Sequence, residues 1–412
     1  MALSSSVWIS FAEIARHAAT RRVVFWGQTE WMVKALAYLP RPAAYVVDNS
    51  VVEHGTTVEG LPVVAPETLW ADDRDGVFVV VTTRAFMEVA AQLEANGFTA
   101  GRHFCVSPTL RDFQIISAIS NCERNVFLMV SDPVAPDDPN RGGGVYELDL
   151  KTRQTRKRLS GFCHGIVDGP EGTVYLVDDS VGGVREVDSE WQTRRVIPLP
   201  PKSRPHGVAY CPKRHRLYVN LSGKDAIIGI DPESGEVVST IQISDKYASH
   251  GTPQHHVNDG FVSGDSLYVS MFSFTGNWKQ QVADGGVLEF DLRNGKCTGP
   301  VVSNLWMPHS PVIIGGALHY CDSMRGAVYN FSARPLVRTY GFIRGIAHDG
   351  ELYYVGQSRH RYLGRLIGQA ENISLDTGIF IVDEASRATR FVATPDLVDV
   401  KTLYLPPAPR ET

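Results

Sequence analysis

The sequence predicts a mainly β protein, a six-bladed β-propeller preceded by a small α/β domain. Three observations lead to this prediction. Apolar runs alternate with helical segments up to about residue 120, short β-rich runs separated by turn residues follow, and one sequence unit recurs five times in this second part. We place the Rossmann-like α/β domain at residues 1–120 and the propeller at residues 123–412.

The composition is that of an ordinary globular chain and excludes several classes of protein. Of 412 residues, 43% are hydrophobic and 21% are charged, and the net charge is −5. An acidic balance argues against nucleic acid as a partner. No apolar run reaches the roughly 18–20 residues of a membrane helix, and no signal peptide is recognisable at the N-terminus. The six cysteines form no C-x-x-C pair, so we expect free thiols and a cytoplasmic location.

The first 120 residues carry the pattern of a buried parallel sheet. Apolar runs predict three strands and amphipathic spacing predicts two helices, the strands at Arg22–Gly27, Ala44–Asp48 and Val77–Thr82 and the helices at Glu30–Leu39 and Phe86–Asn96. The first turn holds Gly27 but lacks the other two glycines of the dinucleotide fingerprint. Asp48 alone stands at the ribose-binding position. We therefore expect no dinucleotide cofactor.

A repeated unit begins after residue 123. Each copy has a polar residue, a small residue, a short apolar strand, a tight turn and a second strand built on Leu/Val-Tyr. The copies begin at His164, His206, Asn258, His309 and Arg344. Their spacings of 42, 52, 51 and 35 residues are those of a four-stranded propeller blade, because a third strand also follows in each copy.

Strands from the two ends of the propeller segment together make up one blade. Asn125–Val130, Gly144–Leu150 and Thr155–Leu159 supply three strands without a first one. Asp399–Leu405 supplies a first strand with nothing after it. Joining them makes the sixth blade, with the C-terminal strand closing the first sheet, and removes the exposed edges of an open ring.

Polar residues at the start of the inner strands predict a site on the propeller axis. In blade order they are His164, His206, Asn258, His309, Arg344 and Asp399. Three converging imidazoles with an open position are typical of a catalytic metal site. We expect His164, His206 and His309 to bind a divalent metal, which could be zinc, manganese, iron or calcium. The alternative is that they bind structural water and neighbouring blades.

Other residues near the ring suit substrate binding and proton transfer. Asn258 and Asp399 could orient a substrate, and Arg344 suits a carboxylate or phosphate. His256 lies two residues before Asn258, on the same face of an extended strand. We expect His256, Arg344 and a loop histidine, His360, to take part in catalysis.

Three long loops are expected on the face that carries the ring, namely Asp132–Gly142, Ser273–Asp284 and Gln357–Thr377. Trp278 lies in the second loop, and Arg359 and His360 lie in the third. We expect Trp278 and Arg359 to contact an oxygen-rich, anionic substrate. A charged loop that is merely solvated is the alternative.

One part of the propeller resembles a known family. Asn258-Asp259-Gly260, Leu267–Met271 and Gly285–Leu288 are similar to the third blade of gluconolactonase/regucalcin-type propellers. The resemblance implies that Asn258 contacts substrate, as the family's Asn does, whereas the family's neighbouring Arg is replaced by His256.

The family's metal ligands do not carry over. Its Glu, Asn and Asp ligands align with His164, His309 and Arg344, and none of the three matches. The resemblance thus implies the fold and the location of the site, and the mismatch argues against a calcium-dependent lactonase. A histidine ring is closer in kind to propeller lyases, such as the zinc-containing peptidyl-hydroxyglycine lyase and the histidine/manganese oligogalacturonate lyases.

Two further resemblances cover larger segments. Residues 123–405, with the motifs HHVNDG and MPHSP, resemble an uncharacterised bacterial propeller family known as a domain of unknown function. Residues 47–69 resemble the Rossmann-like N-terminal domain of bacterial sugar O-acyltransferases and of some methyltransferases.

These observations predict a metal-dependent lyase or epimerase, or a lactone hydrolase, that acts on a small anionic substrate at the propeller axis. The metal would polarise a carbonyl or carboxylate while a histidine moves a proton. The alternative is a non-catalytic propeller that binds a partner protein or a sugar-like ligand. The oligomeric state is left open.

Overall fold

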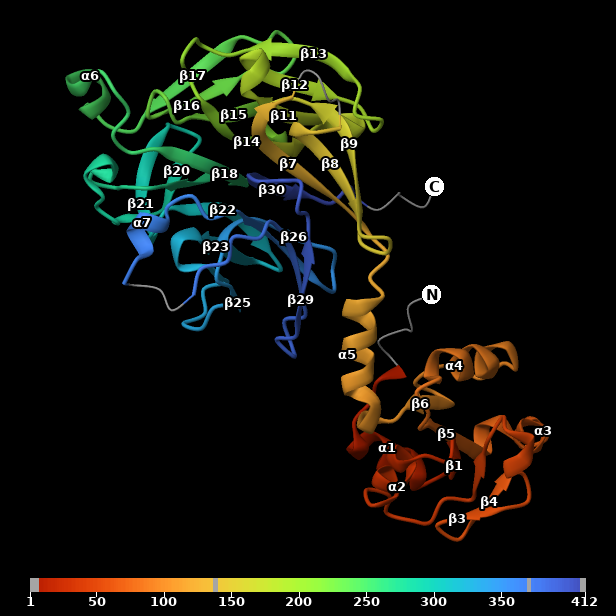
Figure 1. The fold of residues 1–412 in the computed structure, drawn as a ribbon. Coiled ribbons are helices and arrows are strands. Elements are labelled where there is room, and N and C mark those ends of the chain that lie inside the picture. The colour runs from red at the N-terminus through yellow and green to blue at the C-terminus, as the bar shows by residue number, and fades with distance from the viewer. Residues whose placement is uncertain (1–6, 136–139, 369–371, 408–412) are drawn as a thin grey trace. The chain divides into compact units, whose positions relative to one another are not determined.

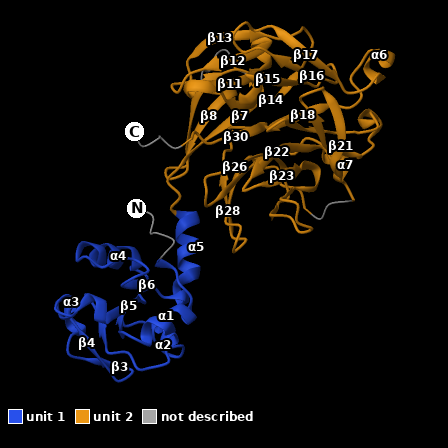
Figure 2. Cartoon of the chain, turned by 180° about the vertical axis from the view of Figure 1, so that it is seen from behind, with its two compact units in different colours: residues 1–120 blue, residues 121–412 orange. Residues whose placement is uncertain are grey.

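The structure is a computed structural model that describes residues 7–135, 140–368 and 372–407 (Figure 1). The chain divides into two compact units, residues 1–120 and 121–412 (Figure 2), and each is described by itself. Among the described residues, none of the helices combines the length and apolar character needed to cross a lipid bilayer.

The first unit is a six-stranded sheet covered by helices. Its helices are α1 (Phe11–Ala18), α2 (Glu30–Leu36), α3 (Pro66–Trp70), α4 (Phe86–Ala95) and α5 (Arg111–Ser120), and its strands are β1 (Arg22–Trp26), β2 (Tyr45–Val47), β3 (Thr57–Val58), β4 (Leu61–Val64), β5 (Val77–Val81) and β6 (Phe104–Val106). The strand order is β3-β4-β2-β1-β5-β6, with β3 antiparallel to β4. The other neighbouring pairs are parallel, as the continuous apolar runs predict.

Both faces of this sheet are buried, because successive side chains of a strand point to opposite faces. Val24 and Trp26 of β1 pack in one core together with Leu93 of α4. Phe25 of the same strand packs in the other core with Ile14 of α1. This explains why the strands of the unit read as unbroken apolar runs.

The turn after β1 is stabilised by a hydrogen bond from its backbone to a carboxylate at the end of β2. Gly27 has a φ of 103°, and a Cβ at this position would lie 2.8 Å from Cβ of Thr83. The carboxylate of Asp48 accepts a hydrogen bond from the backbone N–H of Gln28 at 3.3 Å. Asp48 therefore has a structural role in this turn.

The second unit is a six-bladed propeller, as predicted, with one four-stranded antiparallel sheet per blade. The first blade consists of β30 (Val400–Tyr404), β7 (Asn125–Val134), β8 (Gly142–Asp149) and β9 (Gln154–Ser160), and the second of β10 (Cys163–Asp168), β11 (Val174–Asp178), β12 (Gly183–Val187) and β13 (Thr193–Pro198). The third blade consists of β14 (Pro205–Cys211), β15 (Arg216–Leu221), β16 (Ala226–Ile230) and β17 (Val237–Gln242), and the fourth of β18 (Val257–Ser263), β19 (Ser266–Met271), β20 (Gly285–Asp291) and β21 (Lys296–Leu305). The fifth blade consists of β22 (Pro308–Ile314), β23 (Ala317–Asp322), β24 (Ala327–Tyr329) and β25 (Val337–Arg338), and the sixth of β26 (Phe342–His348), β27 (Tyr353–Ser358), β28 (Gly378–Val382) and β29 (Thr389–Ala393). Two short helices, α6 (Lys246–His250) and α7 (Leu363–Leu366), which the sequence patterns did not predict, lie in the connections.

The C-terminal strand closes the ring, as predicted from the sequence. β30 pairs antiparallel with β7, with Leu403 opposite Leu128 and Tyr404 opposite Phe127. The buried carboxylate of Asp132 also accepts the backbone N–H groups of Val398 and Asp399, each at 2.9 Å. The end of the chain is thereby bound to the first blade through main-chain and side-chain hydrogen bonds.

Carboxylates fix the segments that lead into several inner strands. Asp178 accepts the backbone N–H of Phe162 at 2.8 Å, and Asp322 accepts that of Trp306 at 2.8 Å. Asp225 accepts the N–H groups of His255 and His256, each at 3.0 Å. Together with Asp132, these groups hold the backbone immediately before four of the six inner strands.

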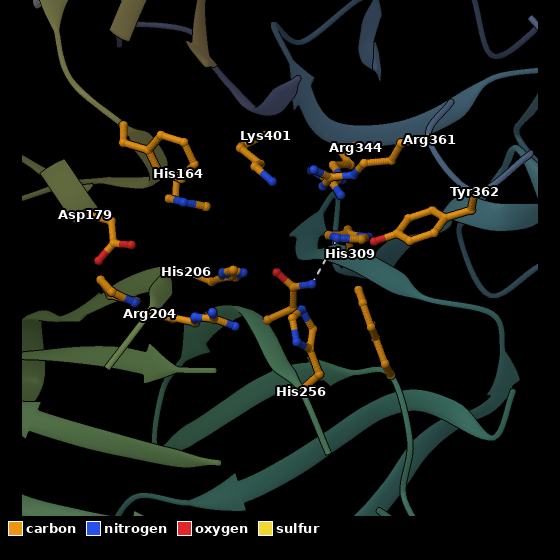
Figure 3. A pocket seen from close by; sticks show the side chains of 14 residues that line it. His164, Asp179, Arg204, His206, His256, His309, Arg344, Arg361, Tyr362 and Lys401 are labelled. Carbon is orange, nitrogen blue, oxygen red and sulfur yellow. Dashed lines mark hydrogen bonds between the residues drawn. The ribbon is translucent and has the colours of Figure 1, made fainter. Parts of the chain in front are cut away.

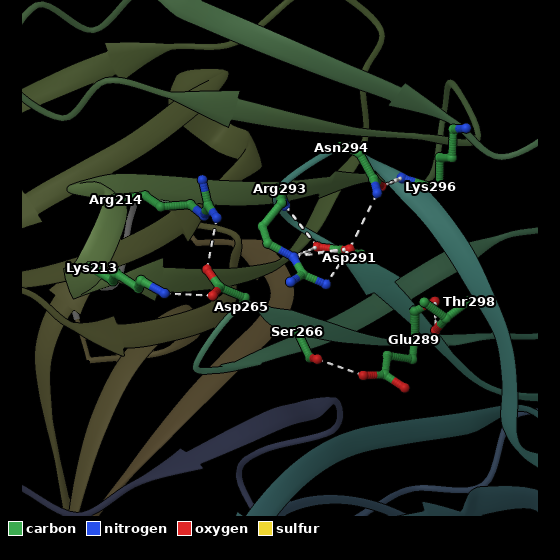
Figure 4. A network of polar contacts seen from close by, with 10 residues as sticks. All are labelled: Lys213, Arg214, Asp265, Ser266, Glu289, Asp291, Arg293, Asn294, Lys296 and Thr298. Atoms are coloured by element: carbon green, nitrogen blue, oxygen red, sulfur yellow. Dashed lines mark hydrogen bonds and ion pairs between the residues drawn. The ribbon is translucent and has the colours of Figure 1, made fainter.

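Neighbouring blades are also linked on the outside of the propeller (Figure 4). Asp265, in the β18–β19 turn, forms ion pairs with Lys213 at 2.5 Å and Arg214 at 2.7 Å, both in the β14–β15 turn. Arg293 pairs with Asp291 of the adjacent strand at 2.8 Å. These pairs are partly exposed, so each contributes at most about 1 kcal/mol.

Small residues allow the inner strands to approach one another near the axis. A Cβ added to Gly165 would lie 2.7 Å from the carbonyl oxygen of His206 and 2.8 Å from the backbone nitrogen of Val208. This position follows His164, the first polar residue of the repeat. The small residue of the repeat is thus required by the close packing of neighbouring blades.

We predict that Gly165→Ala lowers the free energy of unfolding by about 1–3 kcal/mol, because a methyl group must displace backbone of the next blade. Denaturant unfolding measures the change. Gly364→Ala is the control, since no atom lies within 4 Å of its added Cβ. Equal stability of the two variants would contradict this account of the repeat.

Candidate functional site

Six polar residues form a ring around the propeller axis. Each is the second or third residue of an inner strand, at or beside an irregularity in the pairing with the next strand. The ring residues are His164, His206, Asn258, His309, Arg344 and Lys401. We call this set the axial ring.

The sixth member differs from the sequence prediction, which placed Asp399 there. Lys401 is the second residue of β30 and lies at its pairing irregularity, between Val400 and Thr402. Asp399 lies two residues earlier and therefore corresponds to His256 in the fourth blade. The sequence alignment of the last blade was shifted by these two residues.

The ring residues line one pocket with a volume of about 400 Å³ (Figure 3). The other residues in its wall are Phe162, Asp179, Arg204, Pro205, His256, Phe272, Arg361 and Tyr362. Arg344, Arg361 and Tyr362 lie on one side of the pocket, and Asp179 and Arg204 lie on the opposite side. A volume of this size suits a small molecule.

Three cationic side chains of the pocket wall share one carboxylate, that of Asp399, which is not itself among the described residues that line the pocket. Asp399 contacts Arg344 and Arg361 at 2.9 Å each and Lys401 at 3.1 Å. Ser131 also donates a hydrogen bond to it at 3.1 Å. Burial opposes ionisation of Asp399, but the charges of Arg344, Lys401 and Arg361 outweigh it and hold the pKa of this carboxyl well below its usual range.

The charges in this cluster do not balance. When Lys401 is protonated, three cations face one carboxylate, which leaves an excess of positive charge beside the cavity. The guanidinium Nε of Arg344 is buried and has no hydrogen-bond acceptor in the described part of the chain. Such an arrangement attracts an anion that carries further acceptor oxygens.

Burial and the neighbouring cations keep the pocket histidines neutral. Burial, assisted by the charge of Lys401, lowers the pKa of His164 and of His256, the latter to about 3. The pKa values of His206 and His309 are also lowered well below the ordinary value, chiefly by burial. Each imidazole therefore presents one N–H donor and one acceptor nitrogen near neutral pH.

Three of these imidazoles have ring nitrogens that make no hydrogen bond within the described residues: those of His164, His206 and His256. The rings of His164 and His206 are stacked with their centroids 4.5 Å apart, and the ring of His256 stacks on Phe272 at 4.2 Å. These contacts hold the rings in place through their faces. Their nitrogens are left for hydrogen bonds with a bound molecule.

The fourth imidazole is fully hydrogen-bonded. Nδ1 of His309 lies 2.9 Å from the carbonyl oxygen of Met307, which can only accept, so Nδ1 carries the proton. Nε2 then accepts the amide N–H of Asn258 at 2.9 Å (Figure 3). This hydrogen bond fixes the amide of Asn258, whose carbonyl oxygen remains available as an acceptor.

The nitrogen donors of the pocket histidines fit the predicted metal site poorly. His309 already uses both ring nitrogens. Arg344, Arg361 and Lys401 put positive charge in the same pocket, which disfavours a divalent cation. In the described part of the chain, no group of three or more His, Cys, Asp or Glu side chains is placed to hold a metal ion. Metal binding by His164, His206 and His309 stays a prediction that the geometry does not favour.

Lys401 is a titratable pocket residue that the sequence patterns did not single out. Burial and the charge of Arg344 lower the pKa of its ammonium group to about 7, although Asp399 opposes the shift. Its amine points into the middle of the pocket (Figure 3). At neutral pH a substantial fraction of this lysine is an uncharged base and nucleophile.

The predicted loop residues lie away from the cavity. Trp278 packs against His256 with ring centroids 4.9 Å apart, and His360 packs against Phe342 at 5.6 Å. Arg359 is exposed, and its backbone N–H donates to the carbonyl of Val398 at 2.9 Å. None of the three is among the described residues that line the pocket. Trp278 and His360 support the wall from behind, and part of the first and third predicted loops lies outside the described residues.

Four further pocket residues were not chosen as site residues from the sequence. Arg361 and Tyr362 belong to the basic third loop that suggested an anionic substrate, but Arg359 and His360 were chosen from it instead. Phe162 and Arg204 stand two residues before their ring histidines, which is the spacing that singled out His256. Applying that spacing to every blade would have found Phe162 and Arg204.

Comparison with known protein families gives a match for part of the chain. Residues 255–400 match the sequence profile of a family described as a domain of unknown function, DUF4915. No curated protein sequence matches the chain. The predicted resemblance to a propeller family of unknown function is therefore supported for this part of the chain.

Solved structures similar to the chain are propellers of low sequence identity. A protein of unknown function from Bacteroides caccae is 11% identical, with 68% of this chain and 98% of that chain covered and a TM-score of 0.47. Virginiamycin B lyase from Staphylococcus aureus, solved in a catalytically inactive form with quinupristin, is 16% identical, with 56% and 76% covered and a TM-score of 0.38. A gluconolactonase-type protein is 17% identical, with 58% and 76% covered and a TM-score of 0.38. At this level the likeness concerns the fold, and we draw no function from it.

We predict that Asp399→Asn lowers the free energy of unfolding by about 3–5 kcal/mol, because it leaves the buried Arg344 without its carboxylate. Chemical denaturation measures the loss. Asp265→Asn, which breaks the partly exposed pairs with Lys213 and Arg214, should cost less than about 1 kcal/mol. A loss at Asp399 no larger than that at Asp265 would show that the shared carboxylate does not stabilise the fold.

We further predict a pH dependence that originates at Lys401, the group facing Asp399, Arg344, Arg361 and the pocket histidines. Its pKa is about 7 in the folded protein and ordinarily 10.5, so the unfolded chain binds more protons between these values. Stability contributed by this group therefore rises as the pH increases through that window. Lys401→Met should remove the rise, whereas substitution of the exposed Lys279 by Met should retain it. Unfolding measured at several pH values tests this, and parallel curves for wild type and Lys401→Met would contradict it.

Proposed function

We propose that the propeller is an enzyme that binds a small, oxygen-rich anion in the axial pocket and moves a proton next to its acidic group. Elimination or epimerisation would be the outcome, as the sequence analysis expected, but with Lys401 in place of a metal and of His360. The observation that carries the proposal is the cluster of Arg344, Arg361 and Lys401, which contact one carboxylate and line a pocket of about 400 Å³.

Each part of the pocket has a role in this proposal. Arg344 and Arg361 hold the substrate carboxylate or phosphate, because guanidinium groups match the geometry of these anions. The carbonyl oxygen of Asn258 and the ring nitrogens of His164 and His206 bind hydroxyl or carbonyl oxygens of the substrate. This donor and acceptor set favours an oxygen-rich molecule over an apolar acid.

Lys401 is the proton acceptor that fits neutral pH. A general base works best when its pKa lies near the operating pH, and that of Lys401 is about 7. His256, the sequence-based candidate, has a pKa of about 3 and is a weak base in the free pocket.

The experiment is hydrogen–deuterium exchange at the acidic carbon of the compound, which is the carbon next to the carboxylate in a hydroxy acid or sugar acid and the carbon on the far side of the ketone in a 2-oxo acid. Purified full-length protein is incubated in D₂O with a panel of 2-hydroxy acids, 2-oxo acids and sugar acids and lactones, and proton NMR records the exchange. We expect exchange in one class of compound, and a loss of about 100-fold in Lys401→Met. Arg293→Gln, which alters a surface pair far from the axis, should keep the wild-type rate.

Metal removal and ligand binding separate the alternatives. Dialysis against a chelator should leave the exchange rate unchanged, and loss of activity with recovery on adding zinc, manganese, iron or calcium would favour the metal hypothesis. Binding of anions by calorimetry without exchange or turnover would favour the alternative of a non-catalytic ligand-binding propeller.

A further inference from the structure

Lys401 is placed to react with a carbonyl group as well as to accept a proton. It is the one lysine among the described residues that line the pocket. Its side chain is 13% exposed, and its amine points into the cavity (Figure 3). A desolvated amine next to other cations is the usual setting of lysines that form imines.

The neighbours of Lys401 determine which carbonyl compounds would reach it. Arg344 and Arg361 contact the same carboxylate as Lys401, so an anion held by the two guanidinium groups lies beside the amine. The buried Nε–H of Arg344 is a donor that still lacks an acceptor within the described residues. In a 2-oxo acid the ketone carbon is bonded directly to the carboxylate carbon, so anchoring the carboxylate here brings the ketone to the amine.

We propose that Lys401 forms an imine with 2-oxo acids whose carboxylate is bound by Arg344 and Arg361. The nitrogen of Lys401 bonds to the ketone carbon, the carbon–oxygen double bond is lost, and the oxygen leaves as water. An ammonium group and a ketone give a protonated imine and water, so the step needs no oxidant, reductant or further reactant.

The protonated imine would do the work that the sequence analysis assigned to a metal. It withdraws electrons from the neighbouring carbon, so a proton on that carbon, or a bond one atom further, can be broken. The ring nitrogens of His164, His206 and His256 line the same pocket and can relay that proton to solvent through hydrogen bonds. This inference rests on the proposed anion site and narrows its substrate class to 2-oxo acids.

Reductive trapping tests the imine. Full-length protein is treated with pyruvate and sodium borohydride, digested with chymotrypsin and examined by mass spectrometry. We expect one N-(1-carboxyethyl) adduct, on the peptide that contains Lys401, and no adduct when either reagent is omitted. Lys401→Arg, which keeps a positive charge beside Asp399, should lose the adduct, and Lys279→Met should keep it.

The other possible outcomes refute either the imine alone or the imine together with the proposed function. Adducts spread over exposed lysines at similar yield, or a pyruvate adduct that persists in Lys401→Arg, would overturn it. Labelling of Lys401 that does not fall in Arg344→Gln would overturn the assigned role of that arginine. No adduct, with deuterium exchange still dependent on Lys401, would refute the imine and leave the proposed function standing. Absence of both the adduct and the exchange would refute both.

Discussion

The pairing of β30 with β7 is the constraint on which the pocket depends. It joins the last strand of the chain to the first blade and places Asp399 and Lys401 next to Arg344. Hydrogen bonds from Val398 and Asp399 to Asp132 fix the segment just before this strand. Without that closure, the cationic side of the pocket would lack both its lysine and the carboxylate that holds the cations together.

Burial then decides the chemistry of the residues that the closed ring brings together. Guanidinium groups keep their charge under these conditions, whereas imidazole and ammonium groups release protons more easily. The histidines are therefore neutral hydrogen-bonding groups, and Lys401 is divided between its two forms near neutral pH. A pocket interpreted from its sequence as three metal-binding histidines instead combines neutral imidazoles with a cluster of cationic side chains.

Much of the fold could be predicted from the sequence because the blades repeat a local pattern. A polar residue followed by a small one marks the inner strands at His164, His206 and Arg344, since the small residue is required where blades approach the axis. In β30, Lys401 is followed by Thr402, so the pattern fails and the last blade was misaligned. The parallel sheet of the first unit could also be predicted from the sequence, because strands that are buried on both faces consist of unbroken apolar runs.

The remaining site residues depend on the paths of loops and on packing between blades. Arg361 reaches the pocket and Arg359 does not, although both lie in one basic segment. Trp278 and His360 were expected in contact with the substrate, but they pack on His256 and Phe342 instead. No periodicity in the sequence distinguishes these outcomes, because they follow from contacts between distant segments.

The origin of Lys401 in the last strand has a consequence for protein synthesis. A ribosome delivers the chain from its N-terminus, so β7 emerges well before its partner β30. Until then, the first blade has an unpaired edge, of the kind that can pair with other chains. The strand that pairs with this edge is also the strand that brings Lys401 to the pocket, so a nascent chain interrupted before β30 would have neither a complete ring nor this lysine.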